Sequence, residues 1–174
     1  RDILIGTALV DMYSRCCAIE KAEEVFDTLL GRNIVTWNTL IGGYAQQGPA
    51  EKALHCFRKM LEGGISPDVI TFVCVLKACG NIGAIGKGQE IHMAIPPELL
   101  AKNPSIGNSL ISMYAKCGDL VKARQIFDDL SLVWDVASWN TIISAYAQHE
   151  YAEEAFKCFQ SMQKHGFSPN AVTY

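Results

Sequence analysis

The chain repeats itself, and this repetition limits the folds it can adopt more than any other feature. The 35 residues that begin at Ile34, IVTWNTLIGGYAQQGPAEKALHCFRKMLEGGISPD, align without a gap to VASWNTIISAYAQHEYAEEAFKCFQSMQKHGFSPN, which begins at Val136. A second pair, ILIGTALVDMYSRCCAIEKAEEVFD and PSIGNSLISMYAKCGDLVKARQIFD, begins at Ile3 and Pro104. Self-similarity at so short a period indicates an array of small structural units that stack on their neighbours.

These alignments divide residues 1–174 into a single array of short and standard units. The predicted units are 3–33, 34–68, 69–103, 104–135 and 136–170, followed by 171–174 as the start of another unit. Because the pattern is under way at the first residue and still running at the last, we expect both ends to lie within a longer array. Any targeting segment would then lie outside this sequence.

Apolar residues recur within each unit at the spacing of a helix. Trp37, Leu40, Ile41 and Tyr44 follow the pattern i, i+3, i+4, i+7, and a second apolar stripe covers residues 53–61. The aromatic members could instead stack on nucleic-acid bases. Because they share a stripe with leucines, we predict that they lie in the core, as do their counterparts Trp139 and Tyr146.

Glycine and proline separate the two stripes. Gly48-Pro49 lies between them, where glycine suits the end of one helix and proline the first turn of the next. Ser66-Pro67-Asp68 then closes the second helix, since proline cannot continue it. Each unit is therefore predicted to be an αα-hairpin. Stacked hairpins give an all-α fold, an α-solenoid in which the repeats form a superhelix with a concave binding face.

Charge, hydropathy and cysteine usage narrow the class of protein. The net charge of −3 argues against a domain that holds nucleic acid mainly by neutralising phosphates. No apolar run approaches the ~18 residues that a membrane span needs. Of the seven cysteines, Cys16 recurs as Cys117 and Cys56 as Cys158, which favours small buried packing residues with reduced thiols over disulfides.

Catalytic and metal-binding motifs are not found. The run Gly80–Gly88 resembles a phosphate-binding loop, but Asn81 stands where its first glycine is required and Gly88 where a Ser or Thr would bind magnesium. The four histidines lie in separate stretches, none at the helical spacing of a metal pair. They are His55, His92, His149 and His165. We predict no catalytic residue, no metal site and no cofactor.

Several segments resemble pentatricopeptide repeats, and the resemblance covers essentially the whole chain. They are TWNTLIGGYAQ, SLISMYAKCGDLVKARQIFD, MLEGGISPD and TFVCVLKACGNIGAIGKGQEIH. The alternation of unit types resembles the plant class built from P, L and S repeats. It assigns S to 3–33 and 104–135, P to 34–68 and 136–170, and L to 69–103. Tetratricopeptide repeats, at ~34 residues, are a structural neighbour but lack this alternation.

The resemblance implies sequence-specific binding of single-stranded RNA, about one base per repeat. It also implies a role in organellar RNA editing (C-to-U) or RNA processing, in a mitochondrion or chloroplast. The alternative is a protein-interaction scaffold that docks editing cofactor proteins, with the L repeat as the favoured site. Some members of the plant class carry a C-terminal deaminase domain, which needs HxE and CxxC motifs. Neither motif occurs here, so such a domain would have to lie in further sequence.

In this family the fifth and last residues of each repeat read the base. The carried-over pairs are Thr7 with Asn33, Asn38 with Asp68, Val73 with Asn103, Asn108 with Asp135, and Asn140 with Asn170. The family pattern implies the register A, U, unread, U, then C or U, since Val73 cannot hydrogen-bond through its side chain. Hydrogen-bonding capacity alone leaves uracil and cytosine open at the asparagines. Each asparagine could instead be a helix N-cap.

The second residue of each repeat is expected to sandwich a base. These residues are Leu4, Val35, Ile70, Ser105 and Ala137, of which the last two are small and weaken the clamp.

Three departures from the pattern are expected to affect the hairpins. Cys17 and Glu150 replace glycines of the sibling units, Gly118 and Gly48, so their inter-helix turns should be slightly less stable. Pro96-Pro97 should end the second helix of the L repeat early.

Overall fold

The computed structural model describes residues 3–130 and 133–173, and no strand occurs among them. The predicted sixth unit includes Tyr174, which lies outside the described residues. The helices are α1 (Ile3–Arg15), α2 (Ile19–Asp27), α3 (Ile34–Gln47), α4 (Ala50–Glu62), α5 (Val69–Ile82), α6 (Ile85–Ala94), α7 (Pro97–Lys102), α8 (Pro104–Lys116), α9 (Leu120–Asp129), α10 (Val136–Gln148) and α11 (Ala152–Lys164). None of these helices is long and apolar enough to cross a membrane.

The first helix of each predicted repeat begins at the repeat's first residue. These helices are α1, α3, α5, α8 and α10. The cause is visible at three of the borders, where the last residue of one repeat accepts a hydrogen bond from a backbone N–H in the first turn of the next helix. The three capping residues are Asn33, Asp68 and Asp135. Such caps satisfy N–H groups that have no partner within the helix, and so fix where it starts.

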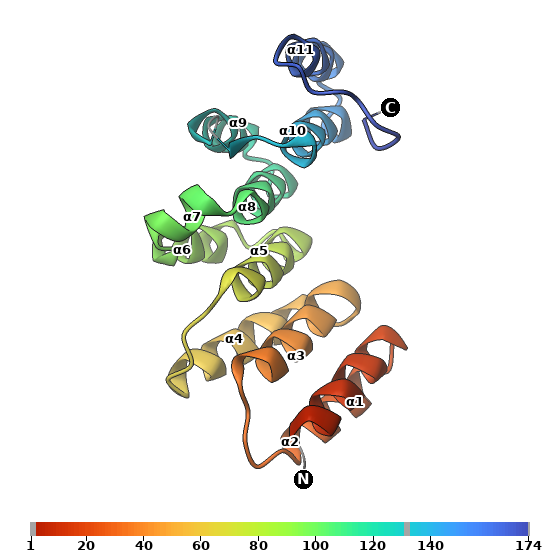
Figure 1. The fold of residues 1–174 in the computed structure, drawn as a ribbon, viewed down its shortest axis with the longest axis vertical. Helices are drawn as coiled ribbons and strands as arrows, with labels where there is room; N and C mark the ends of the chain where they lie inside the picture. The colour runs from red at the N-terminus through yellow and green to blue at the C-terminus, as the bar shows by residue number, and fades with distance from the viewer. Residues whose placement is uncertain (1–2, 131–132, 174) are drawn as a thin grey trace. The chain divides into compact units, whose positions relative to one another are not determined.

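Contacts divide the chain into two compact units, Arg1–Ile82 and Gly83–Tyr174, and each is described by itself. In the first unit α3 packs between α1 and α5, while α2 and α4 complete the hairpins (Figure 1). Val10, Leu40, Ile41 and Leu76 are buried between these helices. Trp37 is buried as well and packs edge-on against Phe26 at 4.7 Å between ring centroids.

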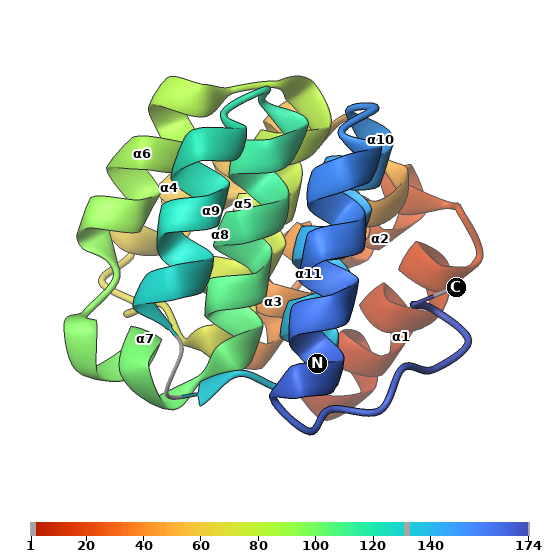
Figure 2. The ribbon, with the colours of Figure 1, turned by 90° about the horizontal axis from the view of Figure 1, so that it is seen from above.

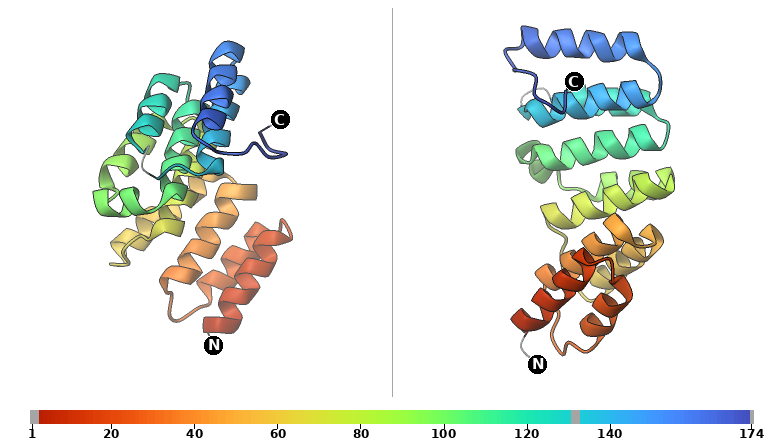
Figure 3. Two further views of the ribbon diagram at one scale, coloured as in Figure 1. Left: turned by 45° about the horizontal axis from the view of Figure 1, so that its top comes forward. Right: turned by 90° about the vertical axis from the view of Figure 1, so that its right-hand side faces the viewer.

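In the second unit α8 packs against α6, α7, α9 and α10. Figure 2 shows α8 and α9 side by side as one hairpin, and the right-hand view of Figure 3 shows α10 beside α11. Trp139 is buried here and contacts Phe127 edge-on at 4.9 Å, with Trp134 stacked on the same Phe127 ring. The core interpretation of Trp37, Trp139 and Tyr44 is therefore confirmed, while Tyr146 is half-buried.

The predicted L repeat differs from its neighbours in structure. Its first helix, α5, belongs to the first unit, and α6 and α7 belong to the second. The prediction that Pro96-Pro97 ends the helix early is confirmed, because α6 ends at Ala94 and Ile95 is extended. Pro97 then begins the short helix α7, as expected for a residue whose fixed φ suits a first helical turn.

The prediction of buried cysteines is partly wrong. Cys56 and Cys158 are buried, but Cys16 is exposed and Cys117 only half-buried. Cys16 directly follows α1, whose last residue is Arg15, so it lies in the turn between two helices and not on the packed stripe. All seven cysteines are free thiols.

Cys17 and Glu150, which replace glycines of the sibling units, both have a left-handed backbone conformation. Cys17 has φ +59° and shares this conformation with its counterpart Gly118, at +86°. Glu150 has φ +66°, whereas Gly48 has φ −106° and does not need glycine's conformational freedom. The unfavourable backbone conformation of Glu150 is therefore not shared by the glycine to which it aligns.

Candidate nucleic-acid interface

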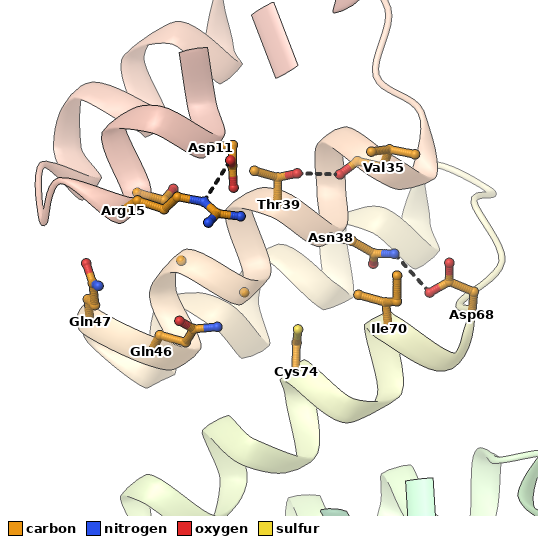
Figure 4. Close-up of a pocket in the computed structure, with 13 residues that line it drawn as sticks. Asp11, Arg15, Val35, Asn38, Thr39, Gln46, Gln47, Asp68, Ile70 and Cys74 are labelled. Atoms are coloured by element: carbon orange, nitrogen blue, oxygen red, sulfur yellow. Dashed lines mark hydrogen bonds and ion pairs between the residues drawn. The ribbon is translucent and has the colours of Figure 1, made fainter. Parts of the chain in front are cut away.

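Asn38, Asp68 and Thr71 form one hydrogen-bonded network, although they come from two predicted repeats. Nδ2 of Asn38 donates to Oδ1 of Asp68 at 2.9 Å (Figure 4), and the hydroxyl of Thr71 donates to Oδ1 of Asn38 at 2.6 Å. The backbone N–H of Thr71 also donates to Oδ1 of Asp68, at 2.8 Å. The predicted pair of fifth and last residues is therefore in direct contact here.

The network keeps the Asp68 carboxylate ionised. Burial raises its pKa, but hydrogen bonds from the backbone N–H of Thr71 and the side chain of Asn38 outweigh burial and hold the pKa below its usual value. An ionised carboxylate only accepts hydrogen bonds. This fixes the donating Nδ2 group of Asn38 on the side that faces Asp68.

The same network recurs 102 residues later. Nδ2 of Asn140 donates to Oδ1 of Asn170 at 3.1 Å, and the hydroxyl of Thr173 donates to Oδ1 of Asn140 at 2.7 Å. The segment that follows α11 turns back beside α10 to make these contacts, as the right-hand view of Figure 3 shows. The two asparagines are also alike in burial, with 7% of Asn38 and 8% of Asn140 exposed.

Thr7 and Asn33 make no direct hydrogen bond to each other, unlike the Asn38–Asp68 and Asn140–Asn170 pairs. The Thr7 hydroxyl donates to the carbonyl of Ile3 at 2.8 Å and lies 3.0 Å from the Thr36 hydroxyl. Oδ1 of Asn33 accepts from both the hydroxyl and the backbone N–H of Thr36. Thr36 thus connects the two predicted readers.

The two remaining pairs are not joined by hydrogen bonds between the described residues. Asp135 forms a capping box with Ser138, and Asn108 makes no hydrogen bond to it. Val73 and Asn103 belong to different compact units, and the Asn103 amide donates to the carbonyl of Leu99 at 2.7 Å. Of the predicted reading asparagines, Asn33, the last residue of its repeat, is a helix N-cap through its side chain.

Two open grooves are lined by the asparagines of the Asn38 and Asn140 networks. We call the first the Asn38 groove; it has a volume of about 550 Å³. Its lining combines the predicted readers Asn38 and Asp68 with the predicted sandwich residues Val35 and Ile70 (Figure 4). The second, the Asn140 groove, has a volume of about 240 Å³ and is lined by Asn140 with residues of α8, α10 and the segment after α11.

The predicted sandwich residues lie on the surface. Val35 is 56% exposed, Ile70 58% and Leu4 75%, and the small side chains of Ser105 and Ala137 are exposed too. Exposed aliphatic residues at one phase of successive repeats offer apolar faces between which a planar ring can insert.

The grooves also contain charged residues that the sequence analysis did not single out. Arg15 lines the Asn38 groove and pairs with Asp11 at 2.8 Å (Figure 4), and Lys116 lines the Asn140 groove. Arg15 and Lys116 occupy the same position in aligned units, so the alignment could have revealed them. Among residues 3–130 and 133–173, no group of His, Cys, Asp and Glu is placed to hold a metal ion.

Comparison with known families identifies these repeats. The family model described as "PPR repeat family" matches residues 32–81 and 135–174, and the "PPR repeat" model matches residues 7–34 and 108–131. The chain belongs to the pentatricopeptide-repeat (PPR) family. The matched residues cover most of this PPR protein and include the fifth residue of all five predicted repeats.

Relatives and solved structures agree with this assignment. The PPR protein is 41% identical over 97% of its length to the Arabidopsis thaliana pentatricopeptide repeat-containing protein At4g25270, chloroplastic, and covers 32% of that protein. It is 38% identical over 99% of its length to At3g24000, mitochondrial, from the same plant, and covers 27% of it. The chain thus spans less than a third of the length of these relatives.

The fold is shared with maize PPR10. The crystal structure of that protein superimposes with a TM-score of 0.82 at 24% identity, covering 100% of this chain and 26% of PPR10. PPR10 in complex with an 18-nt psaJ RNA element gives the same TM-score, 0.82, at 21% identity over 98% of this chain and 26% of PPR10. These likenesses confirm the predicted all-α solenoid of helical hairpins.

Proposed function

We propose that this PPR array binds single-stranded RNA and that the Asn38 and Asn140 networks each read one base. The observation that carries the proposal is one polar network that recurs 102 residues later, each time with its asparagine lining an open groove. In the Asn38 groove the network lies beside exposed aliphatic residues of two adjacent repeats. A polar edge next to apolar faces matches a nucleobase, which has a hydrogen-bonding rim around a stacking surface.

The Asn38 network suits uracil. One N–H of the Asn38 amide is used by Asp68, and its oxygen accepts from Thr71, so the second N–H is the group left to donate. The Asp68 carboxylate has several acceptor positions and retains capacity for another donor. Uracil presents carbonyl oxygens beside the N3–H donor, which complement one donor and one acceptor on the protein.

The Asn140 network offers a different pattern. Oδ1 of Asn170 accepts from the backbone N–H of Val172, which can only donate, so the amide nitrogen of Asn170 points away from that contact. Asn140 and Asn170 therefore both present donors. Two donors complement the acceptors N3 and O2 of cytosine or the carbonyl oxygens of uracil, which agrees with the pyrimidine expected from the family pattern.

The full register proposed for the five repeats is A, U, any base, U, then C or U, from 5′ to 3′. Adenine corresponds to Thr7 with Asn33, and the second uracil to Asn108 with Asp135. The unread base lies at the repeat 69–103, where Val73 provides no polar group. Because the chain has a net charge of −3, we expect modest affinity that depends on base contacts.

Binding of the 174-residue chain to 5′-AUNUY RNA, with flanking nucleotides, tests this proposal. The comparison RNA has guanine at the second and fifth positions, the bases of Asn38 and Asn140, where its larger ring and different edge fit neither network. We expect binding to the first RNA to be at least tenfold tighter, because each well-made base contact contributes roughly 1–3 kcal/mol of discrimination. Equal affinity for both RNAs would contradict base reading.

We further propose that this protein acts in organellar RNA editing or processing and belongs to the plant class with P, L and S repeats. The lengths and order of the units support the class, and the chloroplastic and mitochondrial relatives support an organelle. The repeat 69–103, without a polar fifth residue, is the proposed docking site for editing cofactor proteins. We assign no catalytic role to any residue of this chain.

A further inference from the structure

The third residue of a repeat carries a hydroxyl in four units, and in three of them this hydroxyl contacts the fifth-residue reader of the preceding repeat. The four residues are Thr36, Thr71, Ser138 and Thr173. Thr71 is 0% exposed, so it cannot touch a ligand. Its hydroxyl nevertheless lies 2.6 Å from Oδ1 of Asn38, the shortest distance in the network.

The direction of these hydrogen bonds is determined by groups that can only donate or only accept. The backbone N–H of Asp68 donates to the Thr71 hydroxyl oxygen at 3.2 Å, so the hydroxyl hydrogen is left to point elsewhere. Two acceptors lie within its reach, Oδ1 of Asn38 at 2.6 Å and Oδ1 of Asp68 at 2.9 Å, and the Asn38 oxygen is the nearer of the two. Nδ2 of Asn38 donates to the carboxylate of Asp68. If the amide turned over, its oxygen would face a carboxylate, which is repulsive.

We propose that Thr71 and Thr173 are positioning residues for base discrimination, which they set by holding the amides of Asn38 and Asn140 with the N–H groups toward the ligand. This inference rests on the proposed RNA-reading function. A threonine that never contacts RNA would thereby help to determine whether a repeat prefers a base with a carbonyl or one with an amino group at the same edge.

Removal of the hydroxyl has a specific consequence. In Thr71→Val the shape of the side chain is kept, but Oδ1 of Asn38 loses its buried donor. Nδ2 of Asn38 still donates to Asp68, but no donor holds the oxygen in place, so the amide can rotate and bring its oxygen toward the groove, where it accepts from an amino group such as that of cytosine. The preference for uracil over cytosine at this one base should fall by roughly threefold to tenfold, the equivalent of one hydrogen bond.

The test compares four variants of the 174-residue chain on RNAs that differ only by U or C at one position. We expect Thr71→Val to lower the U/C ratio of affinities at the base of Asn38 and to leave the ratio at the base of Asn140 unchanged. Thr71→Ser keeps the hydroxyl, as Ser138 does naturally, and should retain the ratio. Thr28→Val, which removes a hydroxyl bonded to the Val25 carbonyl outside both grooves, should retain it too.

Thr173→Val is the fourth variant and tests the same idea in the second network, where Thr173 lies in a turn and not in a helix. It should change discrimination only at the base of Asn140, and it decides the matter if Thr71→Val does not fold. The inference is overturned if folded Thr71→Val or Thr173→Val keeps the wild-type ratio. If the wild-type chain itself shows no base preference, the proposed function fails first, which distinguishes the two outcomes.

Discussion

The Asn38 groove and the Asn140 groove are built at the same positions of aligned repeats, yet they differ in size, clamp and charge. The first has about twice the volume, about 550 Å³ against 240 Å³, and contains Val35 where the aligned residue near the second groove is Ala137. The first also contains the Asp11–Arg15 ion pair, where the second has Ser112 and Lys116. The polar network recurs at both grooves, whereas the volume, the aliphatic side chain and the charged residues differ.

The two networks differ at their final residue as well. Asp68 precedes helix α5, and its carboxylate accepts from the N–H of Thr71 as a cap. Asn170 precedes a turn, is exposed, and accepts from the N–H of Val172. We therefore expect the Asn38 network to be the more rigid reader, because its partners are fixed by a helix that is packed against α3 and α4.

The largest expected effect is that of replacing a reader. Asn38→Thr should weaken binding to the cognate uracil by roughly tenfold to a hundredfold and shift the preference at that base only, because the amide donor is lost. Asn140→Thr should do the same at its own base, by a smaller factor if the second network is the looser one. Binding titrations with single-nucleotide RNA variants measure both.

Thermal unfolding separates reading from structure in these variants. If Asn38→Thr unfolds at a much lower temperature and loses binding to every RNA alike, Asn38 supports the fold and does not read.

The clamp is expected to have the next largest effect. Val35→Ala should weaken binding by up to about tenfold, because the variant lacks two methyl groups that a bound base would cover. Ala137→Val, which copies the first groove into the second repeat pair, should strengthen it. Both side chains are exposed, so neither change should alter stability. Unchanged affinity in both variants would show that the second residues do not sandwich a base.

The groove charge should matter less. Asp11→Ser copies Ser112 into the first groove, releases Arg15 from its ion pair and removes a negative charge that repels phosphate. Affinity for RNA at low salt should rise roughly twofold to fivefold, as expected for one exposed charge pair. Titrations at several salt concentrations check this, since the gain should shrink as salt is added. A gain that persists at high salt would point to a cause other than charge.

The smallest effects concern the inter-helix turns and stability alone. Cys17→Gly and Glu150→Gly should each raise the free energy of unfolding by about 0.5–1 kcal/mol, because both residues have positive φ. Gly118→Ala is the matched control and should lower it by a similar amount, since a Cβ there meets no atom within 4 Å and only the backbone is affected. Denaturant unfolding measures all three, and RNA affinity should stay constant.

The sequence predicted much of the fold because repeats and helices share their borders. Five helices begin where predicted repeats begin, and at three of these borders the last residue of the preceding repeat caps the helix. The short helix α7 was missed, although Pro96-Pro97 was correctly taken as a helix end. Two consecutive prolines stop one helix and allow another to start, and only the following residues decide between these outcomes.

The candidate site was predicted less completely. The pairs Asn38–Asp68 and Asn140–Asn170 came from the family pattern, and the structure brings both into contact. The proposed role of Thr71 could not be predicted, because a threonine before an aromatic residue, as in Thr71-Phe72, indicates only a helix start. Thr71 and Asn38 are 33 residues apart in sequence, and their contact depends on how two repeats pack against each other. A sequence pattern alone does not reveal such a contact.

The central claim is that two networks read two bases, and a single-nucleotide scan of the RNA tests it most directly. The affinity of the 174-residue chain is measured for each of the four bases at every position of the five-nucleotide site. We predict pyrimidine discrimination at two positions three nucleotides apart, those of Asn38 and Asn140, and indifference at the position of Val73. Equal affinity for all four bases at both asparagine positions would contradict the account.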